Sequence, residues 1–258
     1  MKVSCIQMNV VLGDVDANLA TVETALKSLD QGTEVVVLPE LFTTDYALKD
    51  IKSLAKKTPA ALERLSALAK TFQIELIGGS LPTLKGEEVF NTLYVFDKTG
   101  EIIHTYDKVH LFRLMDEEKY LSEGKTGGMF TLNNLPQSAV ICYDLCFPEW
   151  ISAQMKHNAN ILYVVAEWPI ERLAHWRHLL IARAIENQVF VVSCNRVGDD
   201  LKHTFAGHSM IVDPWGKVIA EGDEMPGIIS SDLDVRDVDK IRKDIPISED
   251  RRPHLYQR

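Results

Sequence analysis

The sequence lacks long apolar runs and blocks of basic residues. None of its stretches approaches the ~20 consecutive apolar residues that cross a bilayer, so no membrane span is predicted. The 37 acidic residues outnumber the 28 basic ones, and the net charge of −9 argues against nucleic acid and anionic membranes as partners. The segment after Met1 lacks the apolar stretch and cleavage site of a signal peptide, and a cytoplasmic location is therefore expected.

Cysteine is also scarce, and the four cysteines do not form a metal motif. They are Cys5, Cys142, Cys146 and Cys194, with no C-x2-C pair among them. The C-x3-C pair of Cys142 and Cys146 has no histidine pair nearby to complete four ligands, so no metal site is predicted. Disulfides are not expected in a reducing cytosol. Cys5 and Cys194 lie in apolar strand patterns and are interpreted as core residues.

The sequence has no internal repeat and no linker rich in Ser, Gly or Pro, which favours a single domain over residues 1–258. Strand and helix patterns alternate, and about ten strands are expected. The mixture of hairpins and crossover units predicts an α/β fold with two stacked sheets and helices outside, although periodicity alone also allows one wound sheet. The polar stretch 243–258 contains Pro246 and Pro253, and it is expected on the surface or at a subunit interface.

Two local predictions concern residues 58–79. Thr58 is expected to cap a helix whose first position is occupied by Pro59. The run 74–77 is expected to be a strand that ends at Gly78 and Gly79.

Three apolar strand patterns lead to residues that could together perform acyl transfer. The run 139–141 leads to Cys142, the run 35–38 leads through a proline to Glu40, and the run 102–107 stops at Lys108. Each residue alone would be interpreted as a core cysteine or a solvated charge. Because α/β folds gather functional groups at strand ends, all three together favour one common site.

The chemistry of the three groups is complementary. A cysteine attacks as the thiolate, and with an ordinary pKa of ~8.5 it needs a base or a nearby cation. Glu40 is predicted to be that base, since apolar neighbours would raise the pKa of its carboxylate. Lys108 is predicted to stabilise the oxyanion, with the Tyr143 backbone N–H as a second donor. Once ammonia has left, Glu40 could activate water against the thioester of Cys142.

Histidines offer another partner for Cys142, as in the Cys–His hydrolases. His175 and His178 are spaced i, i+3 on a predicted helix, and His208 begins a predicted strand. Packing or surface exposure explains the two helical histidines, and Glu40 is the preferred partner.

These segments resemble the three catalytic motifs of the nitrilase superfamily, the carbon–nitrogen hydrolases. The motifs are LPELF at 38–42, YDKVHLF at 106–112 and ICYDL at 141–145. Two further stretches, ARAIENQ at 182–188 and GHSMIVDPWG at 207–216, are similar to the same family. The resemblance therefore covers nearly the whole chain.

The resemblance implies a four-layer α-β-β-α sandwich with a triad of Glu40, Lys108 and Cys142. It implies that neither a metal nor an organic cofactor is needed. It also implies a homodimer or a larger homo-oligomer, built by extension of the sandwich.

A second glutamate of the family lies between the lysine and the cysteine and positions the substrate and the lysine. Matching the family pattern to Lys119-x-Leu121-x-x-Gly124 selects Glu117 for this role, with Glu118 as the alternative.

The motif AEWP at 166–169, followed by HW at 175–176, resembles the branch related to omega-amidases, which hydrolyse the terminal amide of 2-oxoglutaramate and 2-oxosuccinamate. Glu167 and Trp168, together with Tyr143, are then expected to contact the substrate. A role for Trp168 in the core is an alternative interpretation.

One position departs from these relatives, which usually carry arginine where this chain has Cys146. An arginine there would suit a substrate carboxylate. Its absence calls that substrate into question or moves the carboxylate to Arg113, Arg172 or Arg196.

The function that follows is hydrolysis of a small carboxamide by water, through a cysteine thioester and with release of ammonia. A nitrilase that attacks nitriles with the same residues is one alternative. A non-catalytic binding protein on the same fold is the alternative from another class.

Overall fold

Two six-stranded sheets form the centre of the molecule, and the computed structural model describes residues 1–155, 158–200 and 202–256. The first sheet has the order β14-β1-β2-β3-β4-β5. Only β2 pairs in parallel with both of its neighbours, and the other pairs are antiparallel. The strands are β1 (Lys2–Gln7), β2 (Thr33–Val37), β3 (Glu75–Lys85), β4 (Glu88–Phe96), β5 (Ile102–Asp107) and β14 (Gly227–Asp232).

The second sheet has the order β13-β12-β9-β8-β7-β6, and its three central strands β7, β8 and β9 run parallel. Its strands are β6 (Met129–Leu132), β7 (Leu135–Ile141), β8 (Ile161–Ala166), β9 (Phe190–Asn195), β12 (Met210–Val212) and β13 (Val218–Glu221). A separate short ladder joins β10 (Val197–Asp199) to β11 (Thr204–Ala206).

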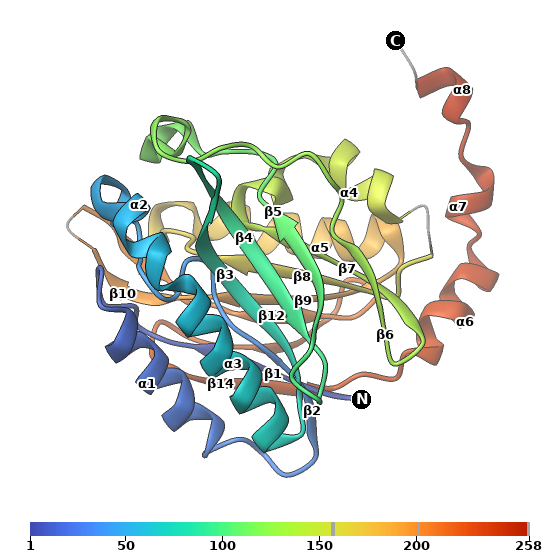
Figure 1. Cartoon of the computed structure of the whole chain (residues 1–258). Helices are drawn as coiled ribbons and strands as arrows, with labels where there is room; N and C mark the ends of the chain where they lie inside the picture. Colours follow the sequence, from blue (N-terminus) through green and yellow to red (C-terminus); the bar gives the residue numbers. More distant parts are fainter. Residues whose placement is uncertain (156–157, 201, 257–258) are drawn as a thin grey trace.

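Helices cover the outer face of each sheet (Figure 1). The first sheet carries α1 (Val15–Leu26) and α3 (Thr58–Phe72), whereas the second carries α4 (Pro148–Met155) and α5 (Leu173–Asn187). The remaining α-helices are α2 (Ile51–Leu54), α6 (Arg236–Asp244), α7 (Ile247–Asp250) and α8 (Pro253–Tyr256).

The strand β2 shows how the sequence produces these layers. Val36 belongs to the apolar cluster beneath α1 and α3, whereas Val35 and Val37 belong to the cluster shared with the second sheet. Successive side chains of a strand point to opposite faces, so a continuous apolar run fits a strand that is buried on both sides. The predicted α-β-β-α sandwich is confirmed. Cys5 and Cys194 are free and fully buried, as expected.

The prediction of about ten strands was too low, because the described residues contain fourteen. The missed strands β6, β10 and β11 have only three or four residues. Runs of this length carry too little periodicity to be recognised.

The helix predicted near Thr58 is confirmed, because α3 begins at Thr58 and has Pro59 in its first turn, but the predicted cap and the predicted strand end were wrong. Thr58 does not cap α3, because its hydroxyl donates a hydrogen bond to the Pro82 carbonyl at 2.5 Å. The strand does not end at Gly78 and Gly79 but continues as β3 to Lys85, with an irregularity between residues 77 and 80. Gly79 has φ +60°, and a Cβ there would lie 2.1 Å from the Pro39 carbonyl oxygen. Glycine thus lets β3 pass beneath the segment that carries Glu40.

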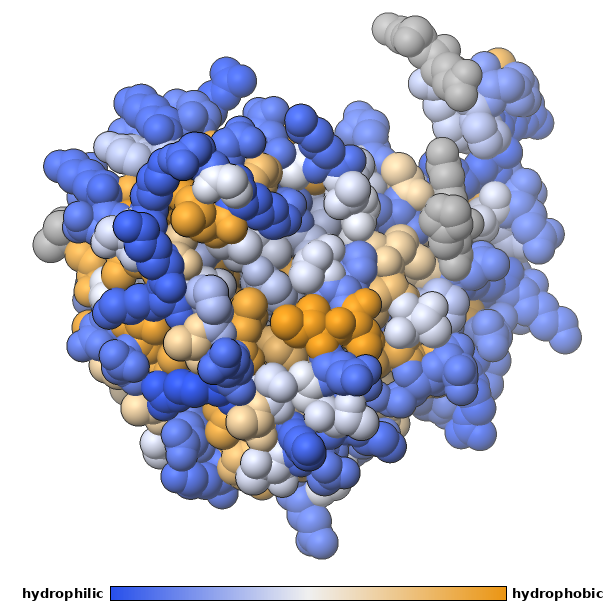
Figure 2. Space-filling model, viewed as in Figure 1, coloured by the Kyte–Doolittle hydropathy of each residue, from blue (hydrophilic) through white to orange (hydrophobic). Residues whose placement is uncertain are grey.

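The C-terminal stretch contains the short helices α7 and α8, which extend away from the sandwich in Figure 1. This projecting segment is mostly hydrophilic in Figure 2, but Leu255 and Tyr256 expose 62% and 60% of their surface. None of the helices within the described ranges is sufficiently long and apolar to span a bilayer.

Candidate active site

Glu40, Lys108 and Cys142 come together between the two sheets. Glu40 follows β2 and Lys108 follows β5 in the first sheet, while Cys142 follows β7 in the second. The ammonium of Lys108 lies 2.8 Å from Oε1 of Glu40, and both side chains are fully buried. Glu40 also raises the pKa of the Cys142 thiol, as a carboxylate beside a thiol does. The three strand ends noted in the sequence therefore meet at one place.

Glu117 completes this buried cluster, whereas Glu118 does not. The Lys108 ammonium lies 2.7 Å from Oε1 of Glu117. The Tyr46 hydroxyl donates to the same oxygen at 2.6 Å, and the Phe112 backbone N–H donates to Oε2 at 2.8 Å. Glu118 is exposed and lines a separate, open surface hollow. One ammonium is thus held between two buried carboxylates.

Burial and charge shift the pKa values of these groups. Burial by itself would lower the pKa of Lys108, but the charges of Glu117 and Glu40 outweigh it and hold that pKa well above its ordinary value. Burial raises the pKa of Glu117, and the Lys108 ammonium opposes the rise. Burial also raises the pKa of the Cys142 thiol, Glu40 raises it further, and Lys108 opposes both effects. The resting thiol is therefore protonated at neutral pH and needs a base before it can attack.

Asp144 holds the turn that presents Cys142. The cysteine has φ +46°, a conformation that costs energy in a residue other than glycine. Oδ2 of Asp144 accepts hydrogen bonds from the Ile141 backbone N–H at 3.1 Å and from the Tyr106 hydroxyl at 2.7 Å. Its Oδ1 accepts the His110 backbone N–H at 2.9 Å. These contacts fix the 3₁₀ turn η5 (Cys142–Cys146) against the strand that leads to Lys108.

Cys142 lines a narrow, partly open cavity. Its wall combines aromatic and charged side chains and contains no histidine, so the Cys–His alternative gains no support. The lining residues are Tyr46, Phe112, Met115, Cys142, Tyr143, Glu167, Trp168 and Arg172. The larger hollow lined by Glu118 contains neither the thiol nor the Lys108 ammonium, and the cavity at Cys142 is therefore the candidate site.

All three residues expected to contact substrate line this cavity. The Glu167 backbone N–H donates to Oε2 of Glu40 at 3.0 Å, so the strand end of β8 also supports the predicted base. Trp168 is 1% exposed and packs at 5.3 Å from the ring of Trp176, which makes it both a core residue and part of the cavity wall. Tyr143 packs against Phe112, with ring centroids 4.9 Å apart.

Sequence reasoning missed Tyr46, Phe112 and Met115. Tyr46 lies in an irregular loop of turns after β2, and Met115 lies in the 3₁₀ turn η3 (Arg113–Met115). Phe112 is the last residue of the motif at 106–112, and Tyr46 and Met115 lie within ten residues of Glu40 or Lys108, which is the only signal that could have drawn attention to them.

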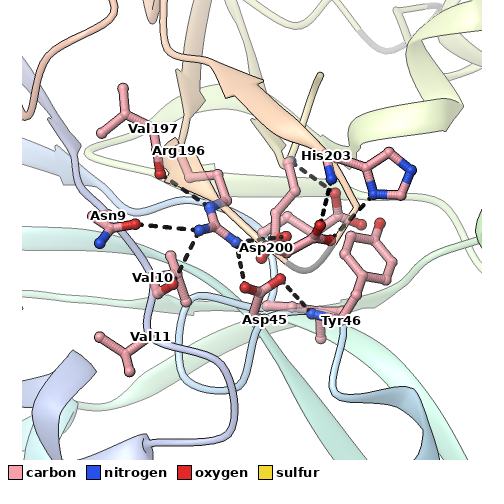
Figure 3. Close-up of polar contacts among 12 residues, drawn as sticks. Asn9, Val10, Val11, Asp45, Tyr46, Arg196, Val197, Asp200 and His203 are labelled. Atoms are coloured by element: carbon pink, nitrogen blue, oxygen red, sulfur yellow. Dashed lines mark hydrogen bonds and ion pairs between the residues drawn. The ribbon is translucent and has the colours of Figure 1, made fainter. Parts of the chain in front are cut away.

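The three arginines considered for a substrate carboxylate occupy different environments. Arg196 is fully buried and forms an ion pair with Asp45 at 2.6 Å (Figure 3). It forms a second ion pair with Glu167 at 3.4 Å. It is therefore unsuited to bind a substrate. Arg113 is exposed and does not line the cavity, whereas Arg172 does. Within the part of the chain that the structure describes, no group of three or more His, Cys, Asp or Glu side chains could hold a metal ion.

Comparisons with known proteins agree with this geometry. The family model described as "Carbon-nitrogen hydrolase" matches residues 2–243. The chain is 43% identical to "2-oxoglutaramate amidase" of Bacillus subtilis (strain 168), covering 98% of each protein. It is 34% identical to human "Omega-amidase NIT2", covering 88% of this chain and 86% of that protein.

Solved structures give the same result. A CN-hydrolase superfamily protein from Xanthomonas campestris superposes with a TM-score of 0.92 at 26% identity, covering 98% of this chain and 97% of the other. Nit3 of Saccharomyces cerevisiae, a member of the nitrilase superfamily, superposes with a TM-score of 0.88 at 30% identity, covering 98% and 96%. Because the family match spans nearly the whole sequence and the fold agrees over the same length, this chain belongs to the carbon–nitrogen hydrolase family.

Proposed function

We propose that this carbon–nitrogen hydrolase is an amidase that releases ammonia from a small carboxamide through a thioester on Cys142. The observation that carries the proposal is the buried ammonium of Lys108, held between Glu40 and Glu117 beside the thiol. A buried cation next to a nucleophile is suited to stabilise the negative oxygen that forms in acyl transfer.

The proposed reaction has two halves. In the first, Glu40 takes the proton from the Cys142 thiol and the thiolate adds to the amide carbon. Lys108 and the Tyr143 backbone N–H stabilise the resulting oxyanion. Glu40 then gives the proton to the leaving nitrogen, the carbon–nitrogen bond breaks, and ammonia departs. In the second half, Glu40 takes a proton from water, hydroxide adds to the thioester, and the acid leaves as the thiol is restored.

The similarity to a 2-oxoglutaramate amidase supports 2-oxoglutaramate or a closely related ω-amide as the substrate. The aromatic wall of the cavity, which includes Tyr143 and Trp168, suits the short carbon chain of such a molecule.

The test of this function is ammonia release from a panel of 2-oxoglutaramate, glutamine, simple aliphatic amides and the matching nitriles. We expect release from 2-oxoglutaramate at a much higher kcat/KM than from any nitrile. Preferential hydrolysis of nitriles would instead identify a nitrilase. A protein that binds these compounds without any turnover would be the non-catalytic alternative.

Glu117 is proposed to hold Lys108 in position, and a pair of neighbouring variants tests this role. Glu117→Gln replaces an oxygen that accepts hydrogen bonds with an amide nitrogen that cannot, and it removes one of the two charges that hold the ammonium. We expect acylation to slow by about 10²-fold or more, measured in single-turnover experiments.

Glu118→Gln is the matched control, since the exposed Glu118 has no contact with the cluster, and its rate is expected to stay near that of the wild type. Equal, near-wild-type rates for both variants would remove Glu117 from the mechanism.

The proposal extends to a homodimer or a larger homo-oligomer, with residues 243–258 at the subunit interface. The exposed Leu255 and Tyr256 on α8 support this placement, because a second subunit could cover them.

A further inference from the structure

Arg172 ends the 3₁₀ turn η6 (Ile170–Arg172) and reaches into the wall of the Cys142 cavity. The carbon of its guanidinium lies 4.4 Å from the ring centroid of Phe112 and 5.2 Å from that of Trp168. Both rings also line the cavity. In addition, Trp168 Nε1 donates a hydrogen bond to the Arg172 carbonyl at 2.9 Å. The aromatic wall therefore holds this side chain in place by cation–π contact.

The guanidinium of Arg172 has no acidic partner in the described part of the protein. Across residues 1–155, 158–200 and 202–256, no acidic side chain lies within ion-pair distance of its guanidinium. The neighbouring arginines differ in this respect, because Arg177, Arg183 and Arg196 each form an ion pair. Stacking against rings occupies the faces of a guanidinium but leaves the N–H donors in its plane available. A half-buried guanidinium in this condition is suited to a ligand anion.

The other charged side chains near the cavity restrict where an anionic group of the substrate can bind. Lys108 is already held by Glu40 and Glu117, and its place beside the thiol suits the oxyanion. Glu167 also lines the cavity, and its Oε1 has no hydrogen-bond partner among the described residues. Because Lys108 is engaged with two carboxylates, a carboxylate on the substrate needs a separate cation. Among the residues that line the cavity, Arg172 provides that cation.

The charge of Arg172 also reaches the turn after the nucleophile. Burial raises the pKa of Cys146, and the nearby Arg172 guanidinium is the first of the charges that oppose this rise. The field of the guanidinium is thus felt at the end of η5 as well as at the aromatic wall.

We propose that Arg172 binds the carboxylate at the far end of the substrate and so selects monoamides of dicarboxylic acids over uncharged amides. This inference rests on the proposed amidase function and assigns the specificity of that same site. The planar guanidinium can make two parallel hydrogen bonds to the carboxylate while Phe112 and Trp168 keep its plane fixed. The amide at the other end of the molecule then lies at Cys142.

The test compares two substrates that differ only in the far group. Glutaramate has a carboxylate where pentanamide has a methyl group. In Arg172→Met, which keeps an apolar stem against the rings but removes the charge, kcat/KM for glutaramate is expected to fall about 10- to 100-fold, the loss typical of a charge-assisted hydrogen bond. For pentanamide it is expected to stay within about threefold of the wild type. Arg172→Lys should recover part of the lost kcat/KM for glutaramate, because it restores the positive charge but not the two parallel N–H donors of the guanidinium.

Arg113→Met is the matched control, since Arg113 is exposed and does not line the cavity. It should leave both substrates unaffected. An equal fall for both substrates in Arg172→Met, or a selective fall in Arg113→Met, would overturn the assignment.

A binding measurement separates this inference from the proposed function. Glutaramate is titrated calorimetrically into Cys142→Ala and into Cys142→Ala combined with Arg172→Met. We expect the double variant to bind about 10- to 100-fold more weakly. If the wild type hydrolyses neither amide but this difference is found, the amidase function fails and the carboxylate site stands. If turnover is normal and binding is equal, the carboxylate site fails and the amidase stands.

Discussion

Replacing Cys142 with alanine is expected to remove ammonia release almost completely, by a factor of about 10⁴ or more, as when the nucleophile of a covalent mechanism is lost. No neighbouring group can take over the attack, since Glu40 and Lys108 are engaged with each other in the buried cluster. The fold should survive, because alanine keeps the Cβ at this position and Asp144 still holds the turn. Steady-state ammonia release tests the loss of activity, and the unfolding midpoint of the same preparation tests whether the fold is retained.

Cys146 provides a matched control four residues further along the same turn. Its half-buried thiol is not part of the cavity wall, and Cys146→Ala should keep activity within a few-fold of the wild type. Wild-type turnover in Cys142→Ala, or complete loss of turnover in Cys146→Ala, would show that Cys142 is not the nucleophile.

Replacing Lys108 with methionine is expected to damage both catalysis and stability. Catalysis loses the proposed oxyanion donor, and removal of one such donor costs about 10²–10³-fold in rate in comparable sites. Stability suffers because Glu40 and Glu117 remain buried without their cation. Removing one partner of a buried ion pair typically costs about 3–5 kcal/mol of unfolding free energy. Single-turnover kinetics and urea unfolding measure the two effects separately.

The stability loss in Lys108→Met should depend on pH in a defined direction. Burial raises the pKa of Glu117 and the ammonium opposes this, so removal of the ammonium raises the pKa further. The folded variant then binds a proton that the unfolded chain releases at a lower pH. Stability therefore falls as pH rises, and the deficit relative to the wild type should be larger at about pH 8 than at about pH 5.5. A deficit that shrinks with rising pH would contradict this account.

Lys85→Met is the control for the loss of a lysine as such. Lys85 pairs with Asp107 at 2.6 Å, but its side chain is 45% exposed. Surface pairs of this kind contribute about 0–1 kcal/mol, and catalysis should be unchanged.

The sequence predicted the positions of the proposed reactive groups along the chain better than their contacts. Apolar runs and turn residues determine where a strand ends, and this located Glu40, Lys108 and Cys142. The contacts of Asp144 could not be foreseen, because Tyr106 and His110 reach it from the other sheet and the loop that follows it. Periodicity carries no information about which strands become neighbours in space.

The arginines show the same limit at the level of single side chains. Arg113, Arg172 and Arg196 were equivalent in the sequence, and only folding distinguishes an exposed, a stacked and an ion-paired guanidinium. The wrong prediction that the strand ends at Gly78 and Gly79 has a related cause. A Gly-Gly pair usually ends a strand, but here the close approach of the Pro39 carbonyl requires glycine within one.

The pairing of β1 with β14 has a consequence for how the protein is made. Lys2 lies opposite Asp232 in this antiparallel ladder, so β1 must wait during synthesis for a partner strand that follows it far along the chain. Contacts this distant in sequence form slowly, because a long loop must close before they can be made. Meanwhile one edge of β1 keeps unpaired backbone groups that favour aggregation and chaperone binding. Co-translational folding can therefore complete the first sheet only after β14 has been synthesised.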